Sequence, residues 1–334
     1  MKTRAPFQGF VLLLLVCCLT SACGTGGSGS IAPGPSVPAP TAVSNGPQLG
    51  YVWDTTTKTL RPILGIPGSS QFGQPVTAAG LYVNGAASAS SAIGLVQEAD
   101  GSIDSVALPS GTAVRISGVT MAAGATILFS PSGQNAILFV PGTTTVTLLT
   151  ALNGNPTATG LTAPVPLLSA AVSDTAQVAI AYGSGPIAVS LLTGNGAQLL
   201  SLSGLGGLSF LPAGNNLLTA DSATGAVTLI RNSSTSPVQQ AFTFTSIQSP
   251  VAIAGSQDGN YAVVANGGDA SVVRLDLTGG TAPLRIACSC QPTQLSTFAG
   301  NAVFGLTAFG PSTAWMVDAS AATPHTLFIP AVKP

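Results

Sequence analysis

Few side chains in this sequence could carry acid–base or metal chemistry. The 334 residues include nine Lys or Arg, ten Asp or Glu and one histidine, His325. A single histidine cannot build a metal site or a Ser–His relay without partners, and we expect it at the surface near a turn. Glu98, Asp100 and Asp104 cluster around Gly101. Their spacing lacks the ligand pattern of a calcium loop and predicts a turn instead, so we expect no catalytic residue and no metal ligand.

Cys288 and Cys290 are the closely spaced cysteine pair outside the N-terminal segment. Residues two apart share one face of a strand, so we expect the two thiols to lie side by side. In oxidising surroundings a disulfide between them would close a small, reducible ring. A structural disulfide, a redox-active pair and two free thiols all remain open.

The sequence shows no signal for a cofactor or for nucleic acid. It contains no glycine-rich phosphate loop, no nucleophile elbow and no array of His and Cys ligands. Because it also lacks a basic run, we expect no nucleic-acid partner. We therefore predict no bound cofactor.

The N-terminus predicts export from the cytoplasm. Lys2 and Arg4 precede an apolar stretch at residues 10–19, and small residues follow it. A charged region, an apolar core and small residues at a cleavage point are typical of a secretory signal peptide. We assign residues 1–22 to this signal.

Cys23 is a candidate lipidation site. The segment from Leu19 to Cys23, Leu-Thr-Ser-Ala-Cys, resembles the lipobox of bacterial lipoproteins, whose cysteine receives a diacylglyceryl group and becomes the mature N-terminus. Families usually carry leucine three residues before the cysteine, and this chain has Thr20 there. The resemblance implies a membrane-anchored lipoprotein of the cell envelope. The alternative is cleavage after Ala22 and a secreted protein.

Residues 23–47 predict a flexible tether. They are rich in Gly, Ser, Pro and Ala, a composition that cannot bury a core. A flexible chain of this length spans roughly 25–30 Å, enough to hold a domain clear of a bilayer.

The remaining residues, 48–334, predict an all-β domain. Charged residues make up 6% of the chain, and Gly and Pro recur throughout, which disfavours long helices. From about residue 126 onward an apolar strand, a turn ending in a small residue, an amide residue and a second apolar strand recur. The third residues of the five turns are Gly133, Ala176, Gly214, Gly259 and Gly300. The intervals of 43, 38, 45 and 41 residues match the length of a four-stranded propeller blade.

The clearest copy of the repeat lies at residues 251–287, with turns at Asp258-Gly259 and at residues 267–269. This copy resembles the WD40-like and YVTN-type β-propeller repeats of bacterial exported proteins, in which an Asp-Gly turn leads into a strand ending near Ala-Asn, here Ala265-Asn266. The resemblance implies a β-propeller of four-stranded antiparallel sheets. We favour seven blades, and six remain possible.

Two parts of the propeller are predicted in more detail. Residues 49–54 and 59–65 resemble the third and fourth strands of a blade, and Ala79-Gly80 resembles the turn before a second strand. The expected innermost strands, which contain no ionisable side chain, are residues 126–129, 168–172, 207–211, 251–255 and 294–298. A catalytic centre on the axis is therefore not expected.

These features favour a noncatalytic, envelope-anchored binding or assembly module whose partner is a protein or a glycan. The aromatic residues Trp53, Tyr82, Tyr261 and Trp315 could stack on sugars, but each lies in an apolar strand pattern, and core packing is the expected role. The alternative is a propeller enzyme of the lactonase-like or lyase type. That alternative rests on fold analogy and predicts a pocket with clustered Arg, Glu and His.

Overall fold

The computed structural model describes residues 46–331, except residues 91, 195 and 311. The predicted signal peptide, Cys23 and all but the last two residues of the predicted tether lie outside the described residues. Every element in the described part is a β-strand. None of its elements is a helix long and apolar enough to cross a membrane.

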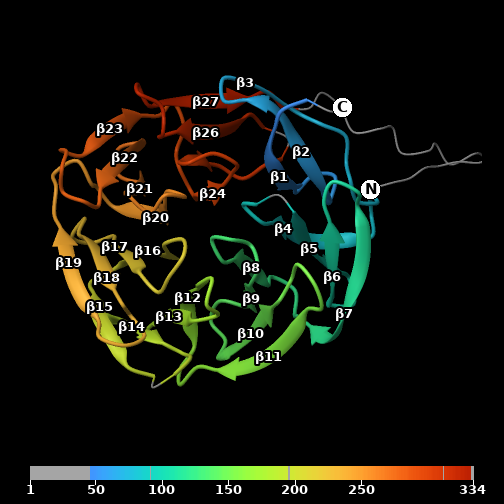
Figure 1. Cartoon of the computed structure of the whole chain (residues 1–334), viewed down its shortest axis with the longest axis horizontal. Coiled ribbons are helices and arrows are strands. Elements are labelled where there is room, and N and C mark those ends of the chain that lie inside the picture. Colours follow the sequence, from blue (N-terminus) through green and yellow to red (C-terminus); the bar gives the residue numbers. More distant parts are fainter. Residues whose placement is uncertain (1–45, 91, 195, 311, 332–334) are drawn as a thin grey trace, which may run out of the picture. The chain divides into compact units, whose positions relative to one another are not determined.

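Seven antiparallel sheets form a ring around a central axis (Figure 1). The first strands, nearest the axis, are β1 (Gln48–Asp54), β4 (Tyr82–Ala87), β8 (Thr126–Phe129), β12 (Leu167–Val172), β16 (Leu205–Phe210), β20 (Pro250–Gly255) and β24 (Ser296–Thr297). The second strands are β2 (Thr59–Ile66), β5 (Ile93–Glu98), β9 (Ala136–Phe139), β13 (Val178–Tyr182), β17 (Leu217–Asp221), β21 (Tyr261–Asn266) and β25 (Val303–Gly305).

The third and fourth strands form the outer half of each sheet. The third strands are β3 (Ser69–Phe72), β6 (Ser102–Ala107), β10 (Thr145–Thr150), β14 (Ile187–Leu191), β18 (Val227–Arg231), β22 (Ser271–Asp276) and β26 (Ala314–Asp318). The fourth strands are β7 (Thr112–Thr120), β11 (Thr157–Thr162), β15 (Gln198–Leu202), β19 (Val238–Phe242), β23 (Leu284–Ala287) and β27 (His325–Ile329). Each sheet pairs consecutive strands, so the prediction of a seven-bladed β-propeller is confirmed.

The strand sequences follow from where each strand lies in its blade. Both faces of a middle strand are covered by neighbouring blades, so these strands are apolar at successive positions, as in β9 (Ala-Ile-Leu-Phe), which is buried throughout. The outermost strand β11 (Thr-Ala-Thr-Gly-Leu-Thr) is exposed along most of its length and rich in threonine. Threonine suits an exposed strand because it combines a β-branched carbon with a hydroxyl.

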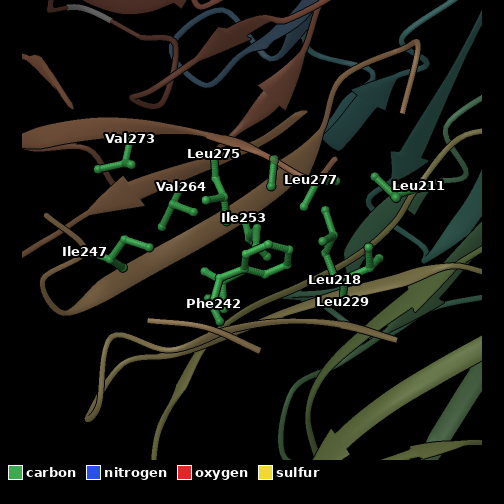
Figure 2. Close-up of a cluster of buried hydrophobic side chains, with 13 residues drawn as sticks. Leu211, Leu218, Leu229, Phe242, Ile247, Ile253, Val264, Val273, Leu275 and Leu277 are labelled. Carbon is green, nitrogen blue, oxygen red and sulfur yellow. The ribbon is translucent and has the colours of Figure 1, made fainter. Parts of the chain in front are cut away.

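The hydrophobic core is divided among the seven interfaces between blades. Each interface holds one cluster of buried side chains. Figure 2 shows the cluster between blades 5 and 6, where Leu218 and Leu229 face Ile253 and Val264 across Phe242. A blade therefore depends on both neighbours for its burial, as in other repeat architectures.

The N-terminal blade differs from the prediction. Residues 49–54 and 59–65 lie in the first and second strands of a blade of their own, and β3 completes this blade with three strands. Ala79-Gly80 precedes the first strand of blade 2, not the second. The small residues 86–91 interrupt the apparent repeat in the sequence, and residues 86–90 contain the end of β4 and part of the first turn of blade 2.

The ring closes without strand exchange between the two ends of the chain. Blade 1 uses only N-terminal strands and blade 7 only C-terminal strands. The backbone N–H of Ala299 donates to the carbonyl of Leu49 at 2.7 Å, and the N–H of Thr55 donates to the carbonyl of Phe309 at 3.1 Å. We call this interface between blades 7 and 1 the seam. Its remaining contacts come from the hydrophobic cluster that contains Phe298 and Phe309, whose rings meet edge to face with centroids 5.8 Å apart.

Candidate functional site

A cavity of about 490 Å³ lies on the axis of the ring, and all seven blades contribute to its wall. Ala86 and Ala87 come from blade 2, Ala170 and Ala171 from blade 4, and Ala254 from blade 6. Small residues keep the first strands from filling the centre. The volume falls within the range of small-molecule sites, about 300–1,000 Å³.

The wall of the axial cavity carries no charge. None of the described residues that line it is Asp, Glu, His, Lys, Arg or Cys. Its polar groups are amides and hydroxyls, notably Gln257, Gln294, Ser296 and Thr297. Of the predicted innermost strands, 126–129 has the predicted bounds, and the predicted strand 294–298 is reduced to Ser296–Thr297. The residues before this short strand are held by hydrogen bonds instead of strand pairing: the backbone N–H groups of Thr293 and Gln294 both donate to the carbonyl of Leu306.

Buried serines shape the turns that follow four of the first strands. They are Ser88, Ser130, Ser173 and Ser256, each 3% exposed or less. Each hydroxyl accepts a hydrogen bond from the backbone N–H of the first residue of the next strand or of the residue just before it, at 3.0 Å for Gln177 and 2.9 Å for Tyr261. The sequence analysis missed these serines. Their spacing, 42 residues from Ser88 to Ser130 and 43 from Ser130 to Ser173, carries the period of the blades.

Asp174 joins three blades beside the axial cavity. Its Oδ1 accepts the backbone N–H of Ser132 in blade 3 at 2.7 Å, and its Oδ2 accepts that of Ala213 in blade 5 at 3.1 Å. Burial raises the pKa of this carboxyl, but the hydrogen bonds, led by those from Ser132, outweigh burial and leave the pKa below its ordinary value. The carboxylate is therefore held ionised as a structural acceptor.

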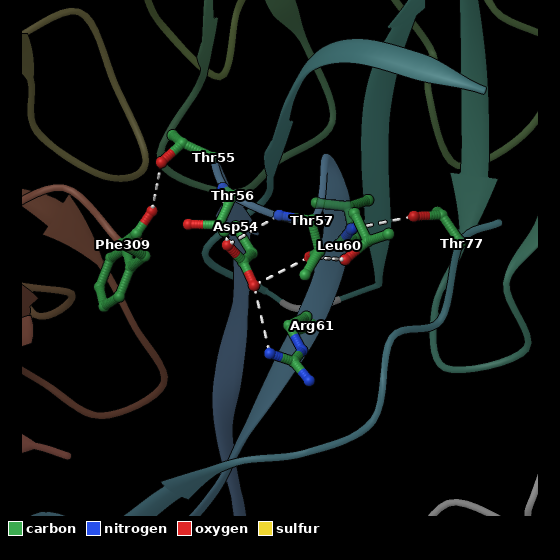
Figure 3. A network of polar contacts seen from close by, with 9 residues as sticks. Asp54, Thr55, Thr56, Thr57, Leu60, Arg61, Thr77 and Phe309 are labelled. Atoms are coloured by element: carbon green, nitrogen blue, oxygen red, sulfur yellow. Dashed lines mark hydrogen bonds and ion pairs between the residues drawn. The ribbon is translucent and has the colours of Figure 1, made fainter. Parts of the chain in front are cut away.

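A polar network fixes the cavity wall at the seam between blades 7 and 1 (Figure 3). The hydroxyl of Thr55, which lines the cavity, donates to the carbonyl of Phe309 at 3.0 Å. Beside it, Asp54 accepts the N–H of Thr56 at 2.9 Å and pairs with Arg61 at 3.2 Å, both side chains being 9% exposed. Burial raises the pKa of Asp54, but hydrogen bonds from Thr56 and Thr57 and the Arg61 charge leave it lowered.

The ionisable residues considered in the sequence lie away from the axial cavity. His325 is exposed at the start of the outermost strand of blade 7, and its Nδ1 lies 2.9 Å from the carbonyl oxygen of Thr323. Glu98 and Asp104 both pair with Arg115 at 2.5 Å. Asp100 accepts the N–H of Ser102 in a turn. In the part of the chain that the structure describes, no group of three His, Cys, Asp or Glu is placed to hold a metal ion.

Asp54, Asp276 and Asp318 all bond to backbone N–H groups of the turns that follow them. This is the structural role that short acidic side chains take at strand ends. Hydrogen bonds from the Thr278 side chain and backbone lower the pKa of Asp276 to about 2.

Cys288 and Cys290 lie just after the outermost strand of blade 6. Their sulfur atoms are 1.96 Å apart, in a disulfide that spans two residues. Both cysteines pack partly against the cluster between blades 6 and 7, next to Trp315. The pair is at the rim of the ring and does not line the axial cavity.

The aromatic residues singled out in the sequence pack mainly within or between blades. Tyr82 is 4% exposed and Trp53 packs in the same cluster between blades 1 and 2. Arg274 lies 5.0 Å over the ring of Tyr261, and Trp315 contacts Phe328 with ring centroids 6.0 Å apart. Trp53 alone of the four also lines the axial cavity.

No family model and no curated protein matches this sequence. Solved structures do match it. A functionally unknown protein from Desulfotomaculum acetoxidans gives a TM-score of 0.60 at 11% identity, covering 86% of this chain and 100% of that chain. Apo AztD from Citrobacter koseri gives 0.57 at 13% identity, covering 85% of this chain and 83% of that chain. The chain has a seven-bladed β-propeller fold.

Lyases are also among the structural neighbours of this propeller. A catalytically inactive histidine-to-alanine variant of virginiamycin B lyase from Staphylococcus aureus, solved with quinupristin, gives a TM-score of 0.51 at 14% identity. The match covers 74% of this chain and 83% of that chain. The virginiamycin B lyase structures thus share the propeller fold of this chain. At such low identity the likeness concerns the fold and not the activity.

Proposed function

We propose that this propeller is a noncatalytic binding module that holds an uncharged ligand in its axial cavity. The observation that carries the proposal is the cavity wall, in which none of the described residues is Asp, Glu, His, Lys, Arg or Cys. General acid–base and nucleophilic catalysis need such groups within hydrogen-bond reach of the substrate. A charged ligand would lose its hydration there without gaining an ionic partner.

A binding screen tests this proposal. Purified full-length chain is titrated with matched neutral, cationic and anionic small molecules, and binding is followed by thermal shift and calorimetry. We expect neutral compounds to bind and to be recovered unchanged by mass spectrometry. Preferred binding of the charged compounds, or turnover of a bound one, would contradict the proposal.

A variant that narrows the axial cavity tests whether the ligand binds there. Ser209 lines the axial cavity and is half-buried, whereas Ser201 is exposed on the outermost strand β15. Ser209→Phe is expected to abolish binding, and Ser201→Phe is expected to leave it unchanged. Equal effects of the two changes would place the binding elsewhere.

The module is proposed to act outside the cytoplasm, anchored in the cell envelope through a lipid on Cys23. The support is the signal-like N-terminus and its resemblance to a lipobox. In a bacterial host, the wild-type chain is expected to incorporate labelled fatty acid and to sediment with membranes. Cys23→Ala should remove the label and release the protein. A wild-type chain that is cleaved after Ala22 and secreted without label would refute the anchor.

The second candidate function is a lyase-type or lactonase-type enzyme, and the virginiamycin B lyase neighbours favour it. Loss of activity in the histidine-to-alanine variant of that lyase indicates that its catalysis needs a histidine. The sole histidine of this chain, His325, is exposed at the outer rim. Incubation with quinupristin followed by mass spectrometry is expected to return the intact compound, and any new covalent product would support the enzymatic function.

A further inference from the structure

The axial cavity has two chemically different sides. Polar side chains come from three consecutive blades: Gln257 from blade 6, Gln294, Ser296 and Thr297 from blade 7, and Thr55 from blade 1. We call these five residues the polar arc. Blades 6, 7 and 1 are neighbours in the ring (Figure 1). The polar arc therefore occupies one continuous side of the cavity.

The opposite side of the cavity is apolar. Leu128 and Phe129 come from blade 3, Ala171 and Val172 from blade 4, and Leu208 from blade 5. Phe129 and Leu128 are only partly buried, so part of each remains accessible. We call these residues the apolar arc.

Hydroxyl groups interrupt the apolar arc at three points, Thr126, Ser130 and Ser209. The Ser209 hydroxyl donates to the carbonyl of Phe210 at 3.3 Å, so its proton is already engaged. The contrast between the two sides of the cavity therefore rests on the side-chain amides, since both amides that line it, Gln257 and Gln294, belong to the polar arc.

The amides of the polar arc retain unused hydrogen-bonding capacity. Gln294 donates through Nε2 to the Ser296 hydroxyl at 3.0 Å and to the carbonyl of Thr307 at 3.1 Å. Within the described part of the chain, no group donates a hydrogen bond to the Oε1 atom of Gln294. The exposed side-chain amide of Gln257 likewise makes none with the described chain. Together the two amides offer donors and acceptors to a ligand without adding charge.

From this arrangement we propose that the ligand of the axial cavity is a neutral saccharide, such as the end of a glycan chain. The inference rests on the proposed function, because it specifies the ligand of the same cavity. Sugar hydroxyls both donate and accept, which suits amides and hydroxyls on one side of a site. The C–H face of a pyranose ring suits Phe129 and Leu128 on the other side. A cavity of about 490 Å³ accommodates a short saccharide and not a long chain.

The test uses matched sugars and the full-length chain. Saturation-transfer NMR and calorimetry are run with N-acetylglucosamine and its β-1,4-linked disaccharide, and with glucosamine and glucuronate as charged analogues. Cyclohexanol serves as a neutral apolar probe. We expect the neutral sugars to bind and each charged analogue to bind at least about tenfold more weakly.

Substitution of two cavity glutamines distinguishes binding in the axial cavity from binding elsewhere on the surface. Gln294→Ala and Gln257→Ala are each expected to weaken sugar binding about threefold to tenfold, the range for one neutral hydrogen bond. Gln71→Ala, on β3 outside the axial cavity, should leave it unchanged. Circular dichroism checks the folding of each variant. If neither cavity variant weakens binding relative to Gln71→Ala, the saccharide site is overturned.

The outcomes for the two proposals differ. Binding of cyclohexanol without binding of the sugars would overturn the saccharide assignment and leave the neutral-ligand function standing. Binding of glucuronate or glucosamine in preference to N-acetylglucosamine would overturn both proposals.

Discussion

At the scale of single residues, the few carboxylates of this propeller mainly stabilise turns by accepting hydrogen bonds from the backbone. Asp174, Asp258 and Asp276 each accept backbone N–H groups, and hydrogen bonding leaves the pKa of each below its ordinary value. A carboxylate offers about four acceptor sites for such bonds, whereas a hydroxyl offers about two. Asp276 and Asp318 each end a strand, where short acidic side chains commonly bond to the amides of the following turn. The sequence does not reveal the role of Asp174, because the groups that Asp174 binds come from two other blades.

Asp174→Asn is expected to lower the free energy of unfolding by about 1–2 kcal/mol. The substitution replaces one acceptor oxygen with an NH₂ group, which then faces the backbone N–H of Ser132 or of Ala213. Urea titration followed by circular dichroism measures the change. Asp318→Asn is the matched control, because both backbone N–H groups that it binds use Oδ1, an oxygen that asparagine keeps. Equal losses in the two variants would contradict the bridging role of Asp174.

At the scale of elements, the sequence predicted strands well where a blade is regular and poorly where it is not. Strand β8 has the predicted bounds, because an apolar run ends at a recognisable Pro-Ser-Gly turn. In blade 2 the first turn lies among alanines and serines, so apolar periodicity gave no signal and only the spacing of Ser88 from Ser130 marks it. The two sides of the axial cavity were not predictable, since they depend on which blades are neighbours across the ring.

The first strands share a second irregularity that the sequence did not indicate. A β-bulge near the start of β4, β12 and β20 sets Val83, Leu168 and Val251 out of register. Their side chains are 43–44% exposed, although they lie in apolar runs. A bulge redirects a side chain by adding one residue to one strand. Neighbouring apolar residues in these strands consequently have opposite environments.

Alanine substitutions of Leu167 and Leu168 test whether these neighbouring residues have different environments. Leu167 is fully buried and Leu168 is 43% exposed. Leu167→Ala is expected to cost about 2–5 kcal/mol of stability, because it opens a cavity between blades. Leu168→Ala should change stability by no more than about 0.5 kcal/mol. Urea denaturation of the two variants measures the change in the free energy of unfolding. Similar losses of stability would show that the bulge does not give the two leucines different environments.

At the scale of the whole molecule, the ring depends on a seam that no strand crosses. Blades 7 and 1 meet through a hydrophobic cluster and a small set of hydrogen bonds. Phe309 is central to this seam, because its ring meets Phe72 at 6.0 Å and Phe298 at 5.8 Å. Opening of the ring is therefore expected to begin between these two blades, because the chain itself links every other pair of neighbouring blades.

Phe309→Ala is expected to lower the free energy of unfolding by about 3–5 kcal/mol, as for other buried phenylalanines. Hydrogen exchange should rise first in β1 and β27, on either side of the seam, and later in β13 and β17. Phe328→Ala is the control. Phe328 is 59% exposed on the same blade, and its removal should cost about 1 kcal/mol or less. Uniform acceleration of exchange around the ring would contradict preferential opening at the seam.

The carboxylates also determine how the whole propeller responds to acid. The pKa values of Asp54, Asp174, Asp221, Asp258, Asp269 and Asp276 are all lowered in the folded chain. A lowered folded-state pKa stabilises the protein above the unfolded value of about 4, and this stabilisation is lost as the pH falls through the folded value. That value is about 2 for Asp276. We therefore expect the Tm to change little between pH 7 and pH 5 and to fall steeply between about pH 4 and pH 2.

Calorimetric melting curves across this range test the expectation, with Asp276→Asn as a variant that should flatten the acid limb. The remaining carboxylates keep part of the slope, so one substitution should reduce it without removing it. A steep fall of the Tm between pH 7 and pH 5 would contradict the assignment, because the aspartates with lowered pKa values remain ionised there. An acid limb unchanged by Asp276→Asn would show that its hydrogen bonds from Thr278 do not contribute to stability.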